Sequence, residues 1–566
     1  MKGQYLYAGK ILWVDLTQKT TWTTPTAVYA QRFLGGKGIG ARVLWEKSGL
    51  PSLDPLGPDN ALSFDTGPLT GTLMPGSGRS LVSGKSPITG LLGTTHFGGS
   101  FAPELKYAGY DHVVVTGQAT EPVYLAIDDE EVTIRSAANI WGLDTYETPK
   151  ALFKELKNDQ IKWVCIGLAG ERLVRFATIL GDRRDSTGGA GLGAVMGSKK
   201  LKALAVHGTG GLRVANPKRF YEMCMKSQDV LKASDITRPF QTFRSGTGRQ
   251  KICCPNCPMC CMEDYHIQDI GDGDIYYQWY ADLARKIGVH DIMMGRILAL
   301  SINKYGYDIT SLGDMIVWAA RLYERSILTD RDIGFSLTWG DGEAYLKLSD
   351  MIVRREGLGD LLAEGPLRAA RAIGYASGQD AICKEDWQGF LLGDGLSAKE
   401  INRSRFAFPA GEAGNVERTV FAEDAIGRAD LLGTCKWHTE INGLPVTAEV
   451  HAEVLSIGLG KKITTDELGA FQRRLRHLER AFNCREGVRR QQDPLPDPCF
   501  SDSGLESGLE DKTIDRDKFE AMKNRYNTLR GWNLKTGVPT RATLESLDLK
   551  DVADELERRS ILPGPL

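Results

Sequence analysis

The sequence lacks the features that would place the chain in a membrane or on a nucleic acid. The first ten residues, MKGQYLYAGK, contain no apolar run of the kind found in signal peptides. No window reaches the ~18 uninterrupted apolar residues that a membrane-spanning helix needs. The formal net charge of −2 at pH 7 is also too small to attract a polyanion. We therefore expect neither a membrane nor a nucleic acid as a partner.

The chain also lacks the regular cysteine spacing of a secreted protein stabilised by disulfides. Its eleven cysteines are irregularly placed, and five of them lie within CCPNCPMCC, residues 253–261. A second Cys-x-x-Cys half is missing, because the other six are single residues: Cys165, Cys224, Cys383, Cys435, Cys484 and Cys499. This usage favours a reducing cytoplasm.

The 566 residues are too many for one ordinary core, so two to four domains are expected. Residues 1–210 have the alternating apolar pattern and the glycine-rich loops of a β-rich domain. The pattern predicts strands at 10–15, 112–116, 123–127, 132–134 and 163–166, with a hairpin around Asp128-Asp129-Glu130.

The pattern becomes helical after Asn216-Pro217, which has the sequence of a helix cap. Helical periodicity predicts helices at 282–305, 312–326, 343–354 and 358–373, and a further helix that Thr464 opens and that runs to about Asn483. The fold class is therefore α+β. We predict a β-rich domain at 1–210 and two mainly helical domains at 211–415 and 416–566.

The dense cysteine group is typical of a metal centre. An iron–sulfur cube needs four thiolates, and a compact loop commonly supplies three of them. Three ligand sets fit this loop: 254/257/261, 254/257/260 and 253/257/261. A zinc site and a group of buried thiols are the alternatives, although zinc sites usually join two paired halves.

The glycine-rich loops of the first 210 residues do not match the nucleotide-binding motifs. Gly84-Lys85-Ser86 resembles the end of a P-loop, but the first glycine falls at Gly78, one residue too early. Any one of these glycine-rich loops could be a tight turn between two strands, with no ligand bound. Several such loops in one β-rich region favour a large, flat ligand that carries phosphate and is held by backbone N–H groups.

Two long stretches resemble the N-terminal domain of the tungsten-containing aldehyde ferredoxin oxidoreductase family. They are GRSLVSGKSPITGLLGTTHFGGSFAPELKYAGYD at 78–111 and LVRFATILGDRRDSTGGAGLGAVMGSKKLKALAV at 173–206. Shorter blocks are similar to the family in the same order: LGGKGIGAR (34–42), GPLTGT (67–72), YGYDITSLG (305–313), GLGDLLAEG (357–365), RAFNCREG (480–487) and LRGWNLKTGVPT (529–540). The resemblance therefore covers nearly the whole chain.

The resemblance implies a tungsten bis-pterin, with molybdenum as the other metal suited to dithiolene sulfur, and one [4Fe–4S] cluster. The family's cluster loop, Cys-x-x-Cys-Pro-x-x-Cys, falls on Cys254, Cys257 and Cys261. The family's fourth ligand ends a D-x-x-G-x-C motif, which falls here on Asp430 to Cys435. On this reading Cys253 and Cys260 are spare thiols.

The resemblance also implies which residues contact the pterins. Asp430 and Asp308 match family carboxylates on the pterin edges, with Asn303 where the family has a further Asp. Arg79 resembles the family's pterin-contacting arginine. His96 and Ser186 fall where backbone carbonyls lie near a magnesium that joins the pterin phosphates. Gly98 and Gly188 are predicted cofactor-binding residues of the same two loops.

The predicted substrate pocket departs from the aldehyde oxidases. The family's Tyr-Glu pair is Tyr277-Gln278 here, and a glutamine cannot exchange a proton. No histidine lies between 291 and 437, so His438 is the nearest imidazole to the fourth cysteine. These three residues are the candidates for catalysis.

The resemblance implies an enzyme that oxidises aldehydes to carboxylic acids and passes electrons to ferredoxin or to an iron–sulfur subunit, in a homo-oligomer or a hetero-complex. The altered pocket keeps a second reading open, a low-potential reductase like the catalytic subunit of benzoyl-CoA reductase. A non-catalytic electron-transfer subunit is the third.

Overall fold

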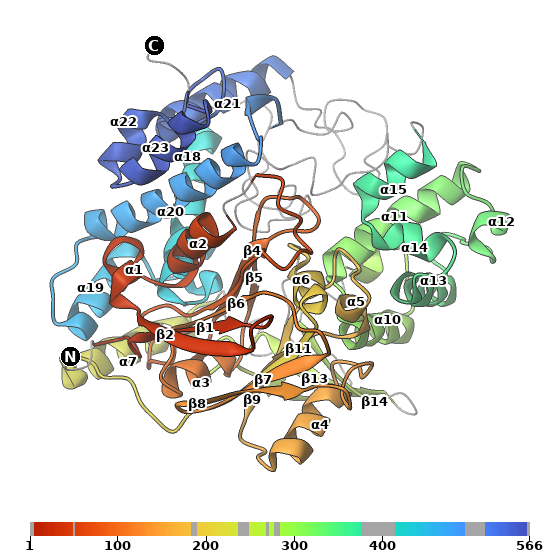
Figure 1. The fold of residues 1–566 in the computed structure, drawn as a ribbon, viewed down its shortest axis with the longest axis horizontal. Helices are drawn as coiled ribbons and strands as arrows, with labels where there is room; N and C mark the ends of the chain where they lie inside the picture. Colours follow the sequence, from red (N-terminus) through yellow and green to blue (C-terminus); the bar gives the residue numbers. More distant parts are fainter. Residues whose placement is uncertain are drawn as a thin grey trace.

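The computed structural model describes residues 5–48, 51–182, 189–235, 248–267, 271–276, 283–374, 414–492 and 516–562. The N-terminal strands form a central base (Figure 1). Helices α10 to α15 lie on one side of this base, and helices α18 to α23 lie on the other. The α+β prediction is confirmed.

The base contains two sheets. The six-stranded sheet has the order β2 (Thr20–Pro25), β1 (Lys10–Asp15), β6 (His112–Thr116), β3 (Leu62–Asp65), β4 (Ser80–Lys85), β5 (Leu92–Phe97). The five-stranded sheet has the order β10 (Leu180–Gly181), β9 (Lys162–Cys165), β11 (Leu201–His207), β7 (Val123–Asp128), β8 (Glu131–Ser136). Alternate apolar residues of both sheets share one core, among them Val14, Val113, Leu125 and Val206.

All five predicted strands are present, with ends that differ by no more than two residues. The predicted hairpin is confirmed, since β7 and β8 pair antiparallel from Asp128 opposite Glu131. Asp129 takes a φ of +48° at the turn, a conformation that aspartate tolerates better than most residues. Short helices connect the strands: α1 (Ala27–Phe33), α2 (Gly36–Lys47), α3 (Phe101–Tyr107), α4 (Glu147–Leu156), α5 (Leu168–Glu171) and α6 (Leu192–Ser198).

We call the helices α10 to α15 the apolar lobe, because their interior is mostly aliphatic and aromatic. They are α10 (Ile292–Tyr305), α11 (Ile309–Glu324), α12 (Asp330–Ile333), α13 (Gly342–Arg354), α14 (Leu358–Ala363) and α15 (Pro366–Ile373). Two predicted helices were too long. The chain turns at Gly288, with a φ of +71°, and α10 begins only after its cap Asp291. The helix predicted for 358–373 is two helices, since Gly365 and Pro366 interrupt it.

We call the C-terminal helices the charged lobe, because many of their buried side chains are ionisable. They are α18 (Gly414–Leu432), α19 (Ala448–Leu459), α20 (Thr465–Arg485), α21 (Arg516–Arg530), α22 (Arg541–Ser546) and α23 (Lys550–Arg558). The predicted start of α20 is confirmed by a capping box between Thr464 and Glu467. Helix α7 (Pro217–Ala233), capped by Asn216 as predicted, packs on α19 although it directly follows the base in sequence. The boundaries near 210 and 415 stay predictions.

A third, three-stranded sheet was not predicted. It contains β12 (Gly248–Ile252), β13 (Met262–Ile267) and β14 (Gly271–Tyr276) in antiparallel order. Its strands are short and polar, so the hydrophobic pattern does not mark them. The loop between β12 and β13 is the cysteine nonapeptide. Within the described ranges, no helix combines the length and the apolar composition needed to cross a membrane.

Candidate functional site

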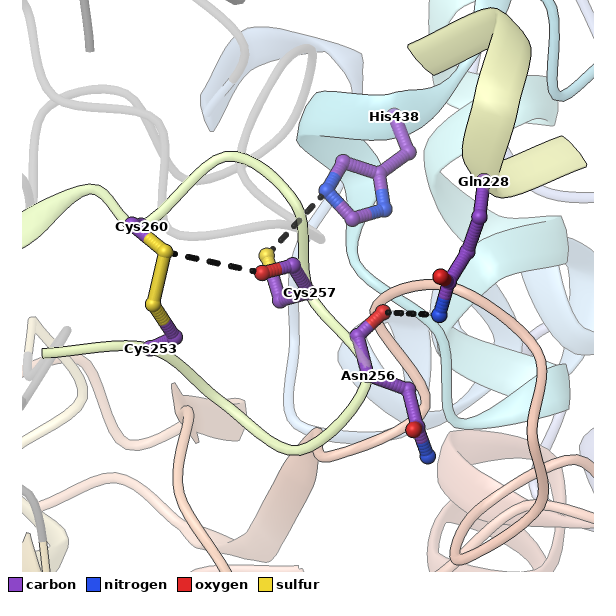
Figure 2. Close-up of a disulfide and its surroundings, with 6 residues drawn as sticks. All are labelled: Gln228, Cys253, Asn256, Cys257, Cys260 and His438. Atoms are coloured by element: carbon purple, nitrogen blue, oxygen red, sulfur yellow. Dashed lines mark hydrogen bonds between the residues drawn. A yellow bond between two sulfur atoms is a disulfide. The ribbon is translucent and has the colours of Figure 1, made fainter. Parts of the chain in front are cut away.

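The cysteine loop is closed at its base by a disulfide between Cys253 and Cys260, with a Cα–Cα distance of 4.3 Å (Figure 2). The pairing of β12 with β13 places Ile252 opposite Met262, so the two ends of the loop come together. The prediction that Cys253 and Cys260 are spare thiols is therefore corrected: each is the other's partner.

The disulfide reduces the number of cluster-ligand sets that the cysteine spacing allows. Two of these sets use Cys253 or Cys260, which are both consumed by the bridge. Cys254, Cys257 and Cys261 lie outside any disulfide, which favours the set that the family resemblance implies. In the described part of the chain, no three His, Cys, Asp or Glu side chains are close enough together to hold a single metal ion.

Cys435 reaches the cysteine loop from the end of α18. The loop Gly76–Gly78 lies between them: a Cβ on Gly76 would stand 2.9 Å from the Cβ of Cys435, and one on Gly78 would stand 3.2 Å from that of Cys254. The pKa of the Cys435 thiol is raised to about 11, mainly by burial; Arg79 lowers this pKa, and the neighbouring thiols of Cys257 and Cys254 raise it.

This thiol group fits an iron–sulfur cluster. Burial, and to a smaller extent repulsion from the neighbouring thiols, disfavours the Cys435 thiolate unless a compensating charge is present. Iron supplies that charge, and thiolate sulfur is its usual protein ligand in such clusters. Cys257 and Cys261 are half-buried against an apolar core that includes Met259 and Leu431, so the loop is held on the protein rather than projecting into water.

His438 faces the cysteine loop. Its Nε2 atom lies 3.5 Å from the Sγ atom of Cys257, and Figure 2 shows the two side chains pointing toward each other. The imidazole is 1% exposed. Burial lowers the pKa of His438 to about 4, so the ring is neutral at physiological pH. The structure thus places this candidate catalytic residue among the cysteines.

A buried polar network supports the chain on either side of Cys435. Arg428 of α18 donates two hydrogen bonds to Glu440, at 2.6 and 2.7 Å, and lies 3.1 Å from Nδ1 of His451. Nε2 of His451 is 3.3 Å from the hydroxyl of Thr434. Sequence reasoning missed this network. A local signal is the histidine at position 451, which is buried in helix α19 among apolar residues such as Val454 and Leu455.

Asp430 and His96 bring the charged lobe and the base together. His96 lies on β5, and its Nδ1 atom is 3.3 Å from a carboxylate oxygen of Asp430. The backbone of Asp430 packs on Gly36, where a Cβ would stand only 2.0 Å from the Asp430 carbonyl oxygen. Gly36 also has a φ of +48°, which favours glycine. The motif LGGKGIGAR thus forms part of α2 and allows α18 to approach closely.

Polar groups near this contact fit a polar ligand. The hydroxyls of Ser80 and Thr94 are buried and have no hydrogen-bond partner in the described ranges. Thr94 lies on the same face of β5 as His96, whereas Ser80, which directly follows Arg79, pairs with Phe97 and lies on the other face. Buried hydroxyls are rarely left without a partner in proteins, so a ligand with donors and acceptors beside His96 would satisfy Thr94. Gly98 is buried just beyond β5.

The segment 303–308 docks on another part of the base. The Thr145 hydroxyl donates to the carbonyl of Asn303 at 2.8 Å, and the amide of Asp308 donates to Phe176 at 3.0 Å. The Asp308 carboxylate is buried and caps α11 by accepting from the amide of Ser311. Asp308, which is a predicted pterin contact, thus also caps a helix. Four predicted site residues lie outside the described residues: Ser186, Gly188, Tyr277 and Gln278.

Known proteins resemble the chain over almost its full length. The family model for the N-terminal domain of aldehyde ferredoxin oxidoreductase matches residues 11–208. The model for domains 2 and 3 of the same family matches residues 193–385 and 379–549.

The relatives include enzymes of different named activities. The tungsten-containing aldehyde ferredoxin oxidoreductase of Pyrococcus abyssi is 30% identical, over 94% of this chain and 97% of the relative. The WOR-like subunit of the aliphatic sulfonate oxidoreductase of Pyrococcus furiosus is 29% identical, over 98% and 99%. The solved active-site complex BamBC of benzoyl-coenzyme A reductase with 1,5-dienoyl-CoA superposes with a TM-score of 0.84 at 26% identity, covering all of both chains.

Proposed function

The chain belongs to the aldehyde ferredoxin oxidoreductase family, and from that premise we propose an oxidoreductase that converts aldehydes to carboxylic acids and passes the electrons to ferredoxin or to an iron–sulfur subunit. The observation that carries the proposal is the meeting of Cys254 and Cys257 with Cys435 beside Arg79. Segments almost two hundred residues apart supply these thiols. We propose that the protein acts in the cytoplasm, because seven cysteines of the described residues lie outside the Cys253–Cys260 disulfide.

We assign a [4Fe–4S] cluster to Cys254, Cys257, Cys261 and Cys435. When bound, such a cluster relays electrons one at a time between the pterin-held metal and an external partner. The half-buried guanidinium of Arg79 lowers the pKa of the Cys435 thiol, so it favours the thiolate form that iron requires.

We assign a tungsten bis-pterin, with molybdenum as the alternative metal, to the junction of the base and the lobes. Arg79, His96 and Asp430 would hold it from one side, and Asn303 and Asp308 from the apolar lobe. Carboxylates suit the donor-rich edge of a pterin, and the buried His96–Asp430 pair supplies one at the junction. Gly98, Ser186 and Gly188 belong to the loops assigned to the pterin phosphates and their magnesium.

A second candidate function is a low-potential reduction. The full-length likeness to the benzoyl-coenzyme A reductase complex BamBC favours it, as does the replacement of the family's glutamate by Gln278. A positioned acid or base typically raises a reaction rate by a factor of ~10²–10⁴. An enzyme with glutamine in place of that acid or base should therefore oxidise ordinary aldehydes slowly. Gln278→Glu separates the candidates. It should raise aldehyde oxidation under the first function and lower turnover of an aromatic CoA thioester under the second.

The proposal is tested on protein purified without oxygen. Metal analysis should find tungsten or molybdenum together with about four irons per chain, the stoichiometry of one [4Fe–4S] cluster. An aldehyde panel with ferredoxin as acceptor should show turnover, and aromatic CoA thioesters with a low-potential donor give the competing result. A chain with iron but with neither metal and no turnover in either assay would overturn both functions and leave only electron transfer.

A further inference from the structure

His438 is the one imidazole whose contact with a cysteine is resolved in the described ranges, at 3.5 Å between its Nε2 atom and the Sγ atom of Cys257 (Figure 2). We propose that His438 is a positioning residue that donates an N–H···S hydrogen bond to the Cys257 thiolate and so raises the reduction potential of the cluster. The proposal rests on the cluster assignment of the proposed function and is independent of the substrate.

The ring has a fixed position. His438 ends the short 3₁₀ helix η3 (Lys436–His438), where its amide donates to the carbonyl of Cys435 at 3.1 Å. The amide of Val446 donates to the His438 carbonyl at 3.3 Å from the other side. A Cβ on Gly76 would stand 2.5 Å from the second ring nitrogen, Nδ1, so the ring packs directly on this backbone. The imidazole is therefore held between Cys257 and the backbone of Gly76.

The chemistry of the two groups fixes the direction of the hydrogen bond. A cysteine that ligates iron is a thiolate, which accepts hydrogen bonds and has none to donate. The contact is favourable when His438 carries its proton on Nε2, which a neutral imidazole can do. This tautomer leaves Nδ1 facing the backbone of Gly76.

A hydrogen bond to a cluster sulfur changes the redox balance. Reduction adds a negative charge that is spread over iron and sulfur, and a donor aimed at a sulfur stabilises that charge. The interaction is strengthened by the burial of the ring, which excludes water from the contact. We therefore expect His438 to favour the reduced cluster, and its loss to make the cluster a stronger reductant and a poorer electron acceptor.

The test compares His438→Phe, which keeps an aromatic ring without a donor, with His438→Gln, which restores an N–H. The potential of the reconstituted cluster is measured by redox titration followed by electron paramagnetic resonance. His438→Phe should move the midpoint to a more negative value, and His438→Gln should bring it back toward the parent. His290→Phe, at an exposed histidine, is the matched control and should not change it.

A second measurement starts from the parent protein, which carries no substitution. Parent protein grown with ring-¹⁵N histidine should show a ¹⁵N hyperfine coupling to the reduced cluster, and the labelled His438→Gln protein should lose it. Absence of the coupling in the parent, or a midpoint identical in parent and His438→Phe, overturns the proposal. A parent chain without iron overturns instead the cluster assignment of the proposed function.

Discussion

The two helical lobes are attached to the same base by different physical means. The charged lobe contacts the base through buried ion pairs, whereas the apolar lobe uses apolar packing and backbone hydrogen bonds (Figure 1). Only the charged lobe delivers a cysteine to the candidate cluster. The difference indicates that the position of the charged lobe is specified more strictly than that of the apolar lobe. The charged lobe carries the one thiol that must meet the three thiols of the cysteine loop.

Two buried ion pairs join α20 of the charged lobe to the base. Lys37 lies inside the motif LGGKGIGAR and contacts Glu479 at 2.7 Å, with exposures of 1% and 5% for the two side chains. Lys85 contacts Glu486 at 2.8 Å and is similarly buried. A buried charge that loses its partner is strongly unfavourable, so a shift of α20 along the base is penalised. Helix α20 also packs on α18, which carries Asp430 and leads to Cys435.

Within the described ranges, we find no comparably buried ion pair between the apolar lobe and the base. Phe176 of the base stacks on Tyr307 with a centroid distance of 5.6 Å, and the Thr178 amide donates to the Gly306 carbonyl at 2.8 Å. The ion pair between Arg175 and Glu364 is only partly buried. Apolar contacts tolerate small adjustments better than ion pairs do, because they have little directional preference.

The largest expected effect follows from removing the thiol that the charged lobe supplies. Cys435→Ala should prevent retention of the cluster, because three thiolates cannot complete a four-cornered site. Iron and acid-labile sulfide, measured after anaerobic reconstitution, should fall by most of the parent value. Cys484→Ala, at a buried cysteine of α20, and the double variant Cys253→Ser/Cys260→Ser are controls that should keep the cluster. Loss of iron in the controls and not in Cys435→Ala would refute the ligand set.

Breaking the ion pair between the charged lobe and the base should give the next largest effect. Glu479→Ala removes the carboxylate that pairs with buried Lys37 and, at 3.4 Å, with Arg476, a change that costs about 3–5 kcal/mol of stability. Urea unfolding should show this loss, and cluster content should fall with it. The double variant Lys37→Met/Glu479→Leu, which removes both charges, should recover most of the stability. A single variant as stable as the parent would show that the pair does not hold the lobe.

Acid should loosen the charged lobe before the apolar lobe. Burial lowers the pKa of His477 in α20 to about 4 from its usual 6.5, so the unfolded state binds more protons between these values. Stability is therefore complete above pH 6.5 and is lost as the pH falls toward 4. This histidine alone accounts for about 2 kcal/mol between pH 7 and pH 5.

Hydrogen exchange of α20 amides, corrected for intrinsic rates, measures this effect. Protection in α20 should fall between pH 7 and pH 5 while protection in α11 changes little. His477→Gln should remove much of the fall. Equal loss of protection in both helices would show that the charged lobe is not the acid-sensitive part.

The smallest effect is expected in the apolar lobe. Ile316→Val in α11 removes one buried methylene and should cost about 1 kcal/mol. Cluster content and the cluster's midpoint potential should match the parent, since α11 contributes no cysteine. A change in either would mean that the apolar lobe also sets the position of the thiols.

Local sequence determined much of this protein. Strand pairs such as β7 and β8, the caps Asn216 and Thr464, and the identity of the cysteine loop are written in residues that are neighbours along the chain. Alternating apolar residues and capping hydroxyls act over a few residues, so their effect can be predicted without a fold. The extent of α10 was missed because the break depends on Gly288 and Asp291, which compete with a helical apolar pattern.

Only the tertiary structure decided which distant groups meet. The disulfide between Cys253 and Cys260 depends on the pairing of two short polar strands, and the contact of His438 with Cys257 depends on α18 reaching the base. The close approach of Asp430 to Gly36 and the buried pair of Lys37 with Glu479 join segments about four hundred residues apart. Such contacts form only when packing has offset the entropy of closing the long loops between them, and no local pattern encodes that balance.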